Sequence, residues 1–234
     1  MGFKKISAPS LKGLFVKELE SMILSGELQV GEKLPSERIL AEQMGVSRTI
    51  VNAGLAEMEG KGFLEIRPRI GVFVADYRRS GSLTTLVSIM SYNGRMLRRD
   101  EVKALLEVRS ALETLILKLV VPKITMKEFL TMEQILEDIR NCQNGTEFAD
   151  CCFRFDHELC IISGNILLPL YYGSFREPCC NLWLRYYQLY GKEPLIQYNE
   201  QLLAFIRSGD LTKALKLSEY RLKETIDGER QLYY

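Results

Sequence analysis

Residues 33–76 read KLPSERILAEQMGVSRTIVNAGLAEMEGKGFLEIRPRIGVFVAD, and the fold of the chain follows from this stretch. Ser36 can cap a first helix by accepting a hydrogen bond from a free amide, and Gly45 ends that helix where a left-handed backbone is easiest. Ser47 begins a second helix, which Gly62 follows. This spacing predicts a helix-turn-helix, whose second helix places its first residues against base edges in the major groove of DNA.

The hydrophobic period changes after Gly62. FLEIR at 63–67 alternates apolar and polar residues, and GVFVA at 71–75 is rich in apolar and β-branched residues, so two short strands are predicted. Arg67 and Arg69 lie in the turn between these strands. A β-ribbon behind a helix-turn-helix makes a winged helix, and two arginines at its tip can reach a minor groove or the neighbouring phosphates.

The composition limits the classes of function. A chain of 234 residues, 47% of them hydrophobic, is long enough for one large or two ordinary domains. Its net charge is only +1, and residues 1–76 hold ten Lys or Arg against ten Asp or Glu, whereas DNA-binding domains are usually basic. Any DNA affinity must then come from a local cluster. We expect Arg38, Arg48, Arg67 and Arg69 on one side of the domain, with moderate and strongly salt-dependent affinity.

The chain contains no apolar run of about 18 residues that could span a bilayer, and its N-terminus lacks a signal-peptide core. We therefore expect a cytoplasmic protein whose cysteines are thiols. The six are Cys142, Cys151, Cys152, Cys160, Cys179 and Cys180. They form no CxxC pair and are interpreted as small buried hydrophobes, with a redox or soft-metal role for the two vicinal pairs as the alternative.

The remaining sequence predicts an amphipathic helix over 11–25 and a helical second half. The polar DYRRSGS stretch marks a domain boundary, so we expect a first domain at 1–76, a linker at 77–82 and a second domain at 83–234. Helices are predicted in the second domain at 83–93, 100–121, 126–141, 146–163, 166–174, 177–190, 194–208 and 211–229. Several are apolar on more than one face, which favours an all-α bundle.

Several phrases of the sequence resemble a known family. LPSER, VSRTIV, GFLEIR and GVFV are similar to the N-terminal domain of GntR-family transcription regulators. EVRSALE, HELCIISGN and AFIRSGDLTKALKL resemble the helical effector domain of the FadR subfamily. The resemblance covers nearly the whole chain. It implies a mostly α fold, with a winged helix-turn-helix followed by an all-α helical-bundle domain that binds an effector and dimerises.

The resemblance also implies which residues contact DNA. Arg48 matches an arginine that begins the recognition helix and suits a bidentate contact to guanine, while Asn52 replaces a frequent arginine and suits adenine. The expected contacts are Arg38, Ser47, Arg48, Thr49, Asn52, Arg67 and Arg69. The alternative for each exposed arginine is a merely solvated side chain. Gly54 stands where alanine is usual and costs the helix about 1 kcal/mol, and Arg69 stands where a glycine is usual.

The effector domain departs from its relatives at the metal site. Many domains of the subfamily hold a divalent metal with one aspartate and three histidines, and aligning SGN at 163–165 and SGD at 208–210 places those positions at Cys152, Asp156, Asn199 and Arg221. The chain has a single histidine, His157, one residue away from the required position. We therefore predict no metal and no other cofactor, with a soft-metal site at Cys152 and Asp156 as the alternative.

Two arginines are expected in the effector pocket instead, Arg109 and Arg221. Burying a guanidinium group is costly unless an anion meets it. The anion is either internal, in a structural Asp156–Arg221 pair or from Glu113, or it is the carboxylate or phosphate of a ligand. The expected effector-binding set is Arg109, Cys152, Asp156, Asn199 and Arg221, and the expected effector is a small anionic metabolite.

Three functions remain open. The first is a ligand-responsive transcription regulator, most simply a repressor, that binds a palindromic operator as a homodimer and changes its population of states when the effector binds. The second is an enzyme, which we do not expect because the sequence shows no Gly-rich phosphate loop and no nucleophile elbow. The third is a DNA-binding or interaction protein whose effector domain has become degenerate and binds no ligand.

Overall fold

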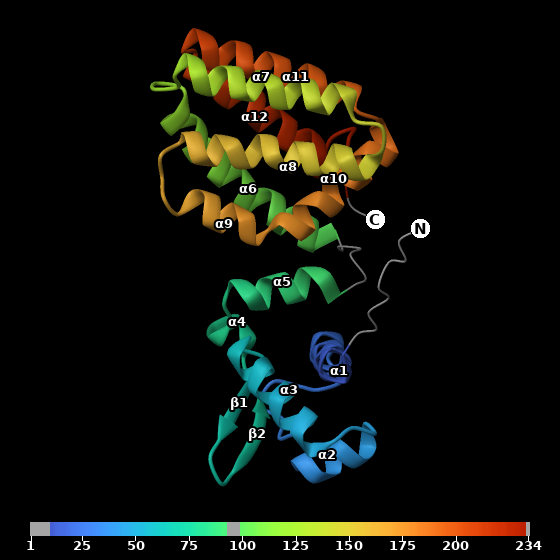
Figure 1. The fold of residues 1–234 in the computed structure, drawn as a ribbon. Helices are drawn as coiled ribbons and strands as arrows, with labels where there is room; N and C mark the ends of the chain where they lie inside the picture. The colour runs from blue at the N-terminus through green and yellow to red at the C-terminus, as the bar shows by residue number, and fades with distance from the viewer. Residues whose placement is uncertain (1–9, 93–98, 233–234) are drawn as a thin grey trace, which may run out of the picture. The chain divides into compact units, whose positions relative to one another are not determined.

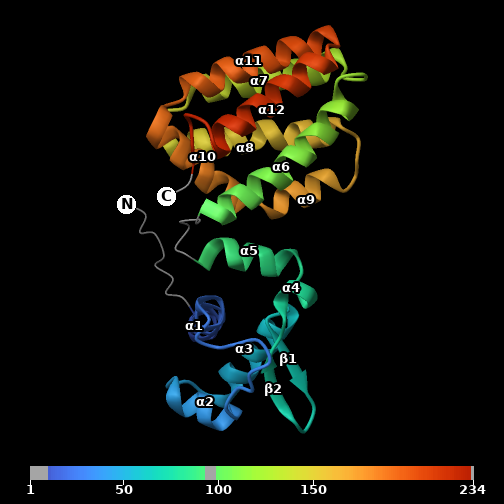
Figure 2. The same cartoon turned by 180° about the vertical axis from the view of Figure 1, so that it is seen from behind.

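Figures 1 and 2 show the fold of the protein as a computed structural model, which describes residues 10–92 and 99–232. The chain divides into two compact units between Tyr92 and Asn93. No helix within the described residues is long and apolar enough to cross a membrane.

The N-terminal unit is a winged helix-turn-helix, as the sequence predicts (Figure 1). Its elements are α1 (Leu11–Ser25), α2 (Glu37–Gln43), α3 (Arg48–Gly60), β1 (Leu64–Arg67), β2 (Gly71–Val74), α4 (Tyr77–Ser80) and α5 (Leu83–Tyr92). The two strands pair antiparallel, with Leu64 opposite Val74 and Arg67 opposite Gly71. The chain just before α2 extends this ribbon, because the Leu34 amide donates to the Val72 carbonyl at 2.9 Å. The wing is thereby joined to the helix-turn-helix by backbone hydrogen bonds.

Local signals in the sequence explain where these helices begin and end. The Ser47 hydroxyl accepts a hydrogen bond from the Ile50 amide at 3.3 Å and so caps α3. Gly45 has φ +63° in the turn between α2 and α3, which is the left-handed backbone that glycine favours. Ser36 occupies the N-cap position of α2 but makes no side-chain capping bond there, so this part of the prediction is wrong.

The core of the N-terminal unit joins α1, α3 and the wing. Phe15 and Leu19 of α1, Val51 and Leu55 of α3, and Phe63 before β1 are all at most 2% exposed. Helix α1 therefore supports the recognition helix from behind, on the side opposite the exposed face of α3.

Gly54 brings α1 and α3 unusually close. A Cβ atom built on Gly54 would lie 2.3 Å from a ring carbon of Phe15, whereas Gly60 at the end of the same helix has open space around it. The glycine that costs helix propensity is thus the residue that allows the aromatic ring to pack. This packing explains the departure from alanine at this position.

Replacing Gly54 with Ala should therefore destabilise the N-terminal unit. The gain in helix propensity is about 1 kcal/mol, but overpacking against a buried ring costs typically about 1–3 kcal/mol. We expect a lower denaturant midpoint for Gly54→Ala and an equal or higher midpoint for the matched control Gly60→Ala. Equal stabilisation by both alanines in urea unfolding would show that Phe15 moves away without cost.

Helix α5 packs with the N-terminal unit, whereas the sequence-based boundary assigned residues 83–92 to the second domain. The Thr85 hydroxyl donates to the Lys61 carbonyl, and the Ser88 hydroxyl donates to the Glu20 carboxylate at 2.9 Å. Ile89 packs against the core of this unit. The expected linker also contains the short helix α4, whose Ser80 hydroxyl donates to the Gly62 carbonyl at 3.0 Å.

The second unit is an all-α bundle, as predicted (Figure 2). Its helices are α6 (Arg99–Val120), α7 (Met126–Asn141), α8 (Gly145–Ile162), α9 (Leu168–Ser174), α10 (Arg176–Tyr190), α11 (Glu193–Ser208) and α12 (Leu211–Ile226). Thr125 and Glu128 form a capping box at the start of α7, and Asp210 caps α12. Helix α6 lies against α8 and α12, while α8 also lies against α7 and α10. Helix α6 therefore lies beside both α8, which carries Asp156, and α12, which carries Arg221.

Candidate functional site

A basic groove lies between the helix-turn-helix and the wing. It has a volume of about 520 Å³. Five basic side chains line it: Lys33, Arg38, Arg48, Arg67 and Arg69. Glu37 is the one carboxylate among the described residues that line it, so the groove carries five positive charges against one negative charge. Half of the basic residues of 1–76 therefore gather here, which explains how a domain that is neutral overall can present a positive surface.

Arg38 and Arg48, on the helix-turn-helix side of the groove, are held by weak surface ion pairs. Arg48 lies 3.8 Å from Glu37 with its side chain 68% exposed, and Arg38 lies 3.5 Å from Glu42 with its side chain 72% exposed. Exposed pairs of this kind contribute about 0–1 kcal/mol. A phosphate or a base edge can therefore replace the carboxylate at little cost.

The wing holds its two arginines differently. Arg67 donates to Glu65 at 2.8 Å and lies over the Phe73 ring at 4.4 Å, so its position is fixed from two sides. Arg69 has φ +64°, the left-handed backbone that glycine adopts without strain. Arg69 therefore places a positive charge at the wing tip although its backbone conformation is strained for a residue with a side chain.

The exposed face of α3 carries the other predicted contacts. Arg48, Thr49 and Asn52 are exposed and lie within the first turns of the helix. The Ser47 oxygen accepts the capping bond from Ile50, and its hydroxyl hydrogen can still donate to a phosphate. The four predicted arginines share one groove, as the sequence predicts, and their contact with DNA stays a prediction. Lys33 was missed because nothing in the sequence places the segment before α2 beside the wing.

A buried charged network occupies the centre of the helical unit. Arg109 of α6 donates to Asp156 of α8 at 2.5 Å, and the Tyr172 hydroxyl donates to the same carboxylate at 2.8 Å. Arg221 of α12 donates to Glu113 of α6 at 2.7 Å. The two ion pairs together balance two positive and two negative charges.

Aromatic rings cover both guanidinium groups. The Trp183 ring lies 4.6 Å from the Arg109 guanidinium carbon and 5.6 Å from that of Arg221. The Tyr198 ring lies 4.2 Å from Arg221, and its hydroxyl donates to Glu113 at 2.9 Å. Cation–π contacts of this kind gain strength where water is excluded. The rings thus stabilise the buried arginines in addition to the carboxylates.

The sequence-based prediction of a structural Asp156–Arg221 pair is wrong, because each of these residues pairs with a different partner. Asp156 binds Arg109, and Arg221 binds Glu113. Arg109 and Glu113 are four residues apart on α6 and so lie on one face of that helix. Because α6 packs against α8 and also against α12, each outer helix supplies the partner of opposite charge.

The pKa shifts follow from burial and from these pairs. Burial acts to raise the pKa of Glu113, but the charges of Arg221 and Arg109 outweigh it and hold this pKa below its usual value. Burial disfavours the charge of Arg109, but Asp156 overcomes this effect and raises the pKa of the guanidinium group. Burial also raises the pKa of the Asp156 carboxyl, against the opposing charge of Arg109. Glu113 is therefore the more firmly ionised of the two carboxylates.

The other predicted effector positions are also buried. Cys152 is 2% exposed on α8, and Asn199 is 3% exposed on α11. Burial raises the pKa of the Cys152 thiol well above its usual value, which disfavours the thiolate that a soft metal needs. Within residues 10–92 and 99–232, no three His, Cys, Asp or Glu side chains are grouped so as to hold a metal ion. The six cysteines are free, and burial raises the pKa of Cys160 and Cys179 to about 12.

Comparisons with known families match both units. The family described as bacterial regulatory proteins of the gntR family matches residues 15–74, and the FCD domain matches residues 104–223. The chain belongs to the FCD-domain family and carries a GntR-family helix-turn-helix. The FCD match spans half of the chain and contains Arg109, Asp156 and Arg221, so the buried network lies inside the FCD domain.

Several curated proteins are similar to this GntR–FCD chain. It is 34% identical to the HTH-type transcriptional regulator Mce2R of Mycobacterium tuberculosis over 109 residues. This aligned region is 47% of the chain and 45% of that protein. It is 28% identical to LutR of Bacillus subtilis, over 63% of the chain and 65% of that protein. It is 27% identical to the Uxu operon transcriptional regulator of Escherichia coli, over 89% of the chain and 82% of that protein. The chain thus spans less than half the length of Mce2R and less than two thirds of LutR.

Solved structures also share the fold, and one of them matches almost the whole chain. It is Lar, which controls the expression of the Listeria monocytogenes agr system. The TM-score is 0.64 with 16% sequence identity, over 96% of this chain and 99% of that one. At this identity the likeness concerns the fold alone.

Proposed function

We propose that this protein is a sequence-specific transcription regulator, acting as a repressor, whose DNA binding is modulated by a small anionic metabolite. The observation that carries the proposal is the basic groove beside the exposed start of α3. A net positive groove between a recognition helix and a wing suits the polyanionic backbone of DNA. The similarity to Mce2R, LutR and the Uxu operon regulator supports the same function.

The proposed binding mode uses two kinds of contact. Helix α3 enters the major groove, where Arg48 contacts guanine, Asn52 contacts adenine and Thr49 contacts a phosphate. Arg67 and Arg69 of the wing contact phosphates or the minor groove. A homodimer in the bacterial cytoplasm would present two such surfaces to a palindromic operator. The phosphate contacts supply affinity, and the base contacts supply sequence preference.

The helical domain supplies the proposed regulation. We propose that it belongs to the FadR subfamily and that it binds no metal, because Arg221 puts a cation at one of the four positions where relatives hold their metal ligands. Binding of an anionic effector changes the relative free energy of two dimer arrangements and so changes DNA affinity. The function needs no catalytic residue, and the matched relatives are transcription regulators, so we propose a protein that is not an enzyme.

One observation favours a second candidate function. Both buried arginines are already neutralised by internal carboxylates, at 2.5 and 2.7 Å. A domain closed in this way could serve only for dimerisation, with DNA binding independent of any ligand. A small molecule that changes operator affinity would exclude this candidate.

The salt dependence of DNA binding tests the role of the groove. The logarithm of the binding constant falls with the logarithm of salt concentration by about 0.9 per neutralised phosphate. We expect Arg69→Gly to reduce the magnitude of this slope by about 1 for each bound domain. Glycine suits the left-handed backbone at this position, so the change removes charge without adding strain.

A matched control is Arg154→Gln in the helical unit, which removes an exposed arginine paired with Asp138 at 3.2 Å. This control should leave the slope unchanged in fluorescence anisotropy titrations. If Arg69→Gly and the unaltered protein show the same salt slope, the wing tip does not contact DNA phosphates.

A further inference from the structure

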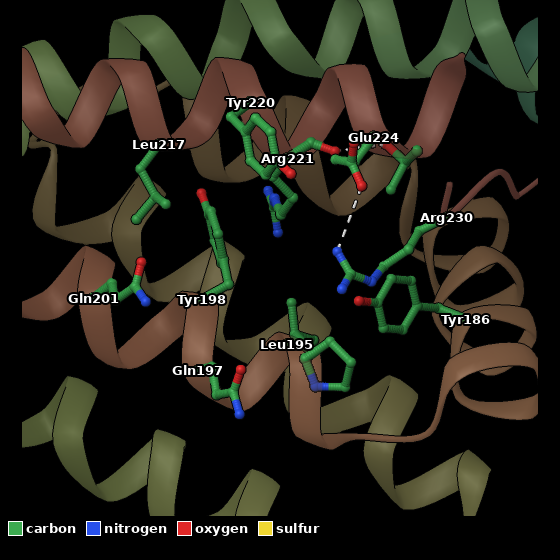
Figure 3. A pocket seen from close by; sticks show the side chains of 12 residues that line it. Tyr186, Leu195, Gln197, Tyr198, Gln201, Leu217, Tyr220, Arg221, Glu224 and Arg230 are labelled. Atoms are coloured by element: carbon green, nitrogen blue, oxygen red, sulfur yellow. Dashed lines mark hydrogen bonds and ion pairs between the residues drawn. The ribbon is translucent and has the colours of Figure 1, made fainter. Parts of the chain in front are cut away.

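A second concave site lies beside the buried network. It is a pocket of about 250 Å³ between α10, α11, α12 and the segment at residues 227–232. Arg221, Arg230, Tyr186, Tyr198 and Glu224 are among its lining residues. Figure 3 shows the guanidinium groups of Arg221 and Arg230 on two sides of this space, with the Tyr198 and Tyr186 rings beside them. Of the five effector positions expected from the sequence, this pocket contains only Arg221.

The 227–232 segment is held firmly against the bundle. The Arg230 amide donates to the Glu224 carbonyl at 3.1 Å, and the Tyr190 hydroxyl donates to the Gln231 carbonyl at 2.8 Å. The Arg185 side chain donates to the Leu232 carbonyl at 3.0 Å, and Leu232 is only 3% exposed. These contacts fix the backbone that carries Arg230 beside the pocket, which its side chain lines.

The two arginines differ in how strongly they are neutralised. Arg221 is bound by Glu113 at 2.7 Å on its inner side, whereas Arg230 lies 3.5 Å from Glu224 with its side chain 39% exposed. The longer, more exposed pair is the weaker one. A ligand carboxylate can therefore displace Glu224 from Arg230 and bind both guanidinium groups through charge-assisted hydrogen bonds.

The size and walls of the pocket limit the rest of the ligand. A cavity of about 150 Å³ accommodates benzene, and drug-sized ligands occupy about 300–1,000 Å³. The observed 250 Å³ lies between these values, so it suits one ring with one small substituent. Tyr186 and Tyr198 both line the pocket, so their rings are the aromatic groups that such a ligand ring can contact.

We propose that this pocket binds a small aromatic monocarboxylate, with the carboxylate between Arg221 and Arg230 and the ring against Tyr186 and Tyr198. This assignment rests on the proposed effector role of the helical domain and names the class of its ligand. Because Arg221 also contacts Glu113, a ligand on the outer side of Arg221 acts directly on the buried network. Glu113 and Asp156 remain the internal partners of the two buried arginines.

Calorimetric titration of the full chain with benzoate and with benzamide tests the proposal. Benzamide has the same shape without the charge, so we expect it to bind at least tenfold more weakly than benzoate. The Arg230→Gln variant should lose at least tenfold in benzoate affinity while keeping the melting temperature of the unaltered protein. The control Arg154→Gln should bind benzoate as the unaltered protein does, because Arg154 does not line this pocket.

Equal affinity for benzamide and benzoate would overturn the proposal, and so would an unchanged benzoate affinity in Arg230→Gln. The absence of any benzoate binding up to about 10 mM ligand would overturn it as well. DNA binding is measured on the same samples. If benzoate fails to bind while sequence-specific DNA binding persists, the ligand assignment alone is wrong. If benzoate binds as expected while DNA does not bind, the proposed regulator function is wrong and the pocket assignment stands.

Discussion

Replacing Asp156 with Leu is expected to destabilise the helical unit by about 3–5 kcal/mol. The substitution leaves Arg109 buried beside Trp183 without its carboxylate, and it removes the acceptor of the Tyr172 hydroxyl. An uncompensated buried charge costs far more than the loss of one contact. Trp183 is the one tryptophan of the sequence and lies in this unit, so its fluorescence during urea unfolding reports the loss selectively.

The matched control lies on the same helix. Asp150 of α8 pairs with Arg176 at 2.9 Å, but both side chains are about half exposed, so Asp150→Leu should change stability by less than about 1 kcal/mol. The double variant Arg109→Met, Asp156→Leu should recover most of the stability, because apolar residues of similar volume can replace a buried ion pair. A double variant as unstable as Asp156→Leu would mean that shape rather than charge decides the effect.

Replacing Arg48 with Ala is expected to weaken binding to the preferred DNA site by about 1–3 kcal/mol for each recognition helix. This loss follows from the bidentate contact that an arginine at the start of a recognition helix makes with guanine. The fold should be unaffected, since the Arg48 side chain is 68% exposed and its ion pair with Glu37 spans 3.8 Å. Binding is compared by anisotropy on the preferred duplex and on a duplex with the contacted base pair changed.

Arg48→Ala should lose its preference at one base pair of each half-site, because it removes a base contact. Arg69→Gly should weaken binding to both duplexes alike, because a phosphate contact carries no sequence information. The contrast between the two variants separates base reading from charge. Equal affinity of Arg48→Ala and the unaltered protein for the preferred duplex would refute the role given to Arg48.

The winged helix-turn-helix could be predicted from the sequence because its boundaries are marked locally. Ser47 caps α3, Gly45 takes a left-handed backbone, and the period changes at Gly62, so each boundary is set by one or two residues. The gathering of four arginines also followed, since the helix-turn-helix and the wing fix their positions. These features depend on short-range structure, which the sequence encodes directly.

Apart from the Ser36 side-chain cap, which is absent, the errors concern contacts between segments that are far apart in the chain. Apolar periodicity identifies residues 83–92 as a helix but does not say which core buries it, and Thr85 and Ser88 bind to the N-terminal unit. The ion-pair partners of Arg109 and Arg221 could not be predicted, because they depend on which helices pack against α6 in the folded chain. Lys33 and Arg230 were missed for the same reason, because only the folded chain brings them to the groove and to the pocket.

Selection of binding sites from random duplex DNA, at two salt concentrations, tests whether this chain reads DNA sequence. We expect enrichment of one short palindrome at both concentrations, with affinity falling steeply as salt rises. It further predicts that the enriched sequence changes at one position per half-site when Arg48→Ala replaces the unaltered protein. Recovery of random sequences alone, bound only at low salt, would contradict the claim that this chain reads DNA sequence.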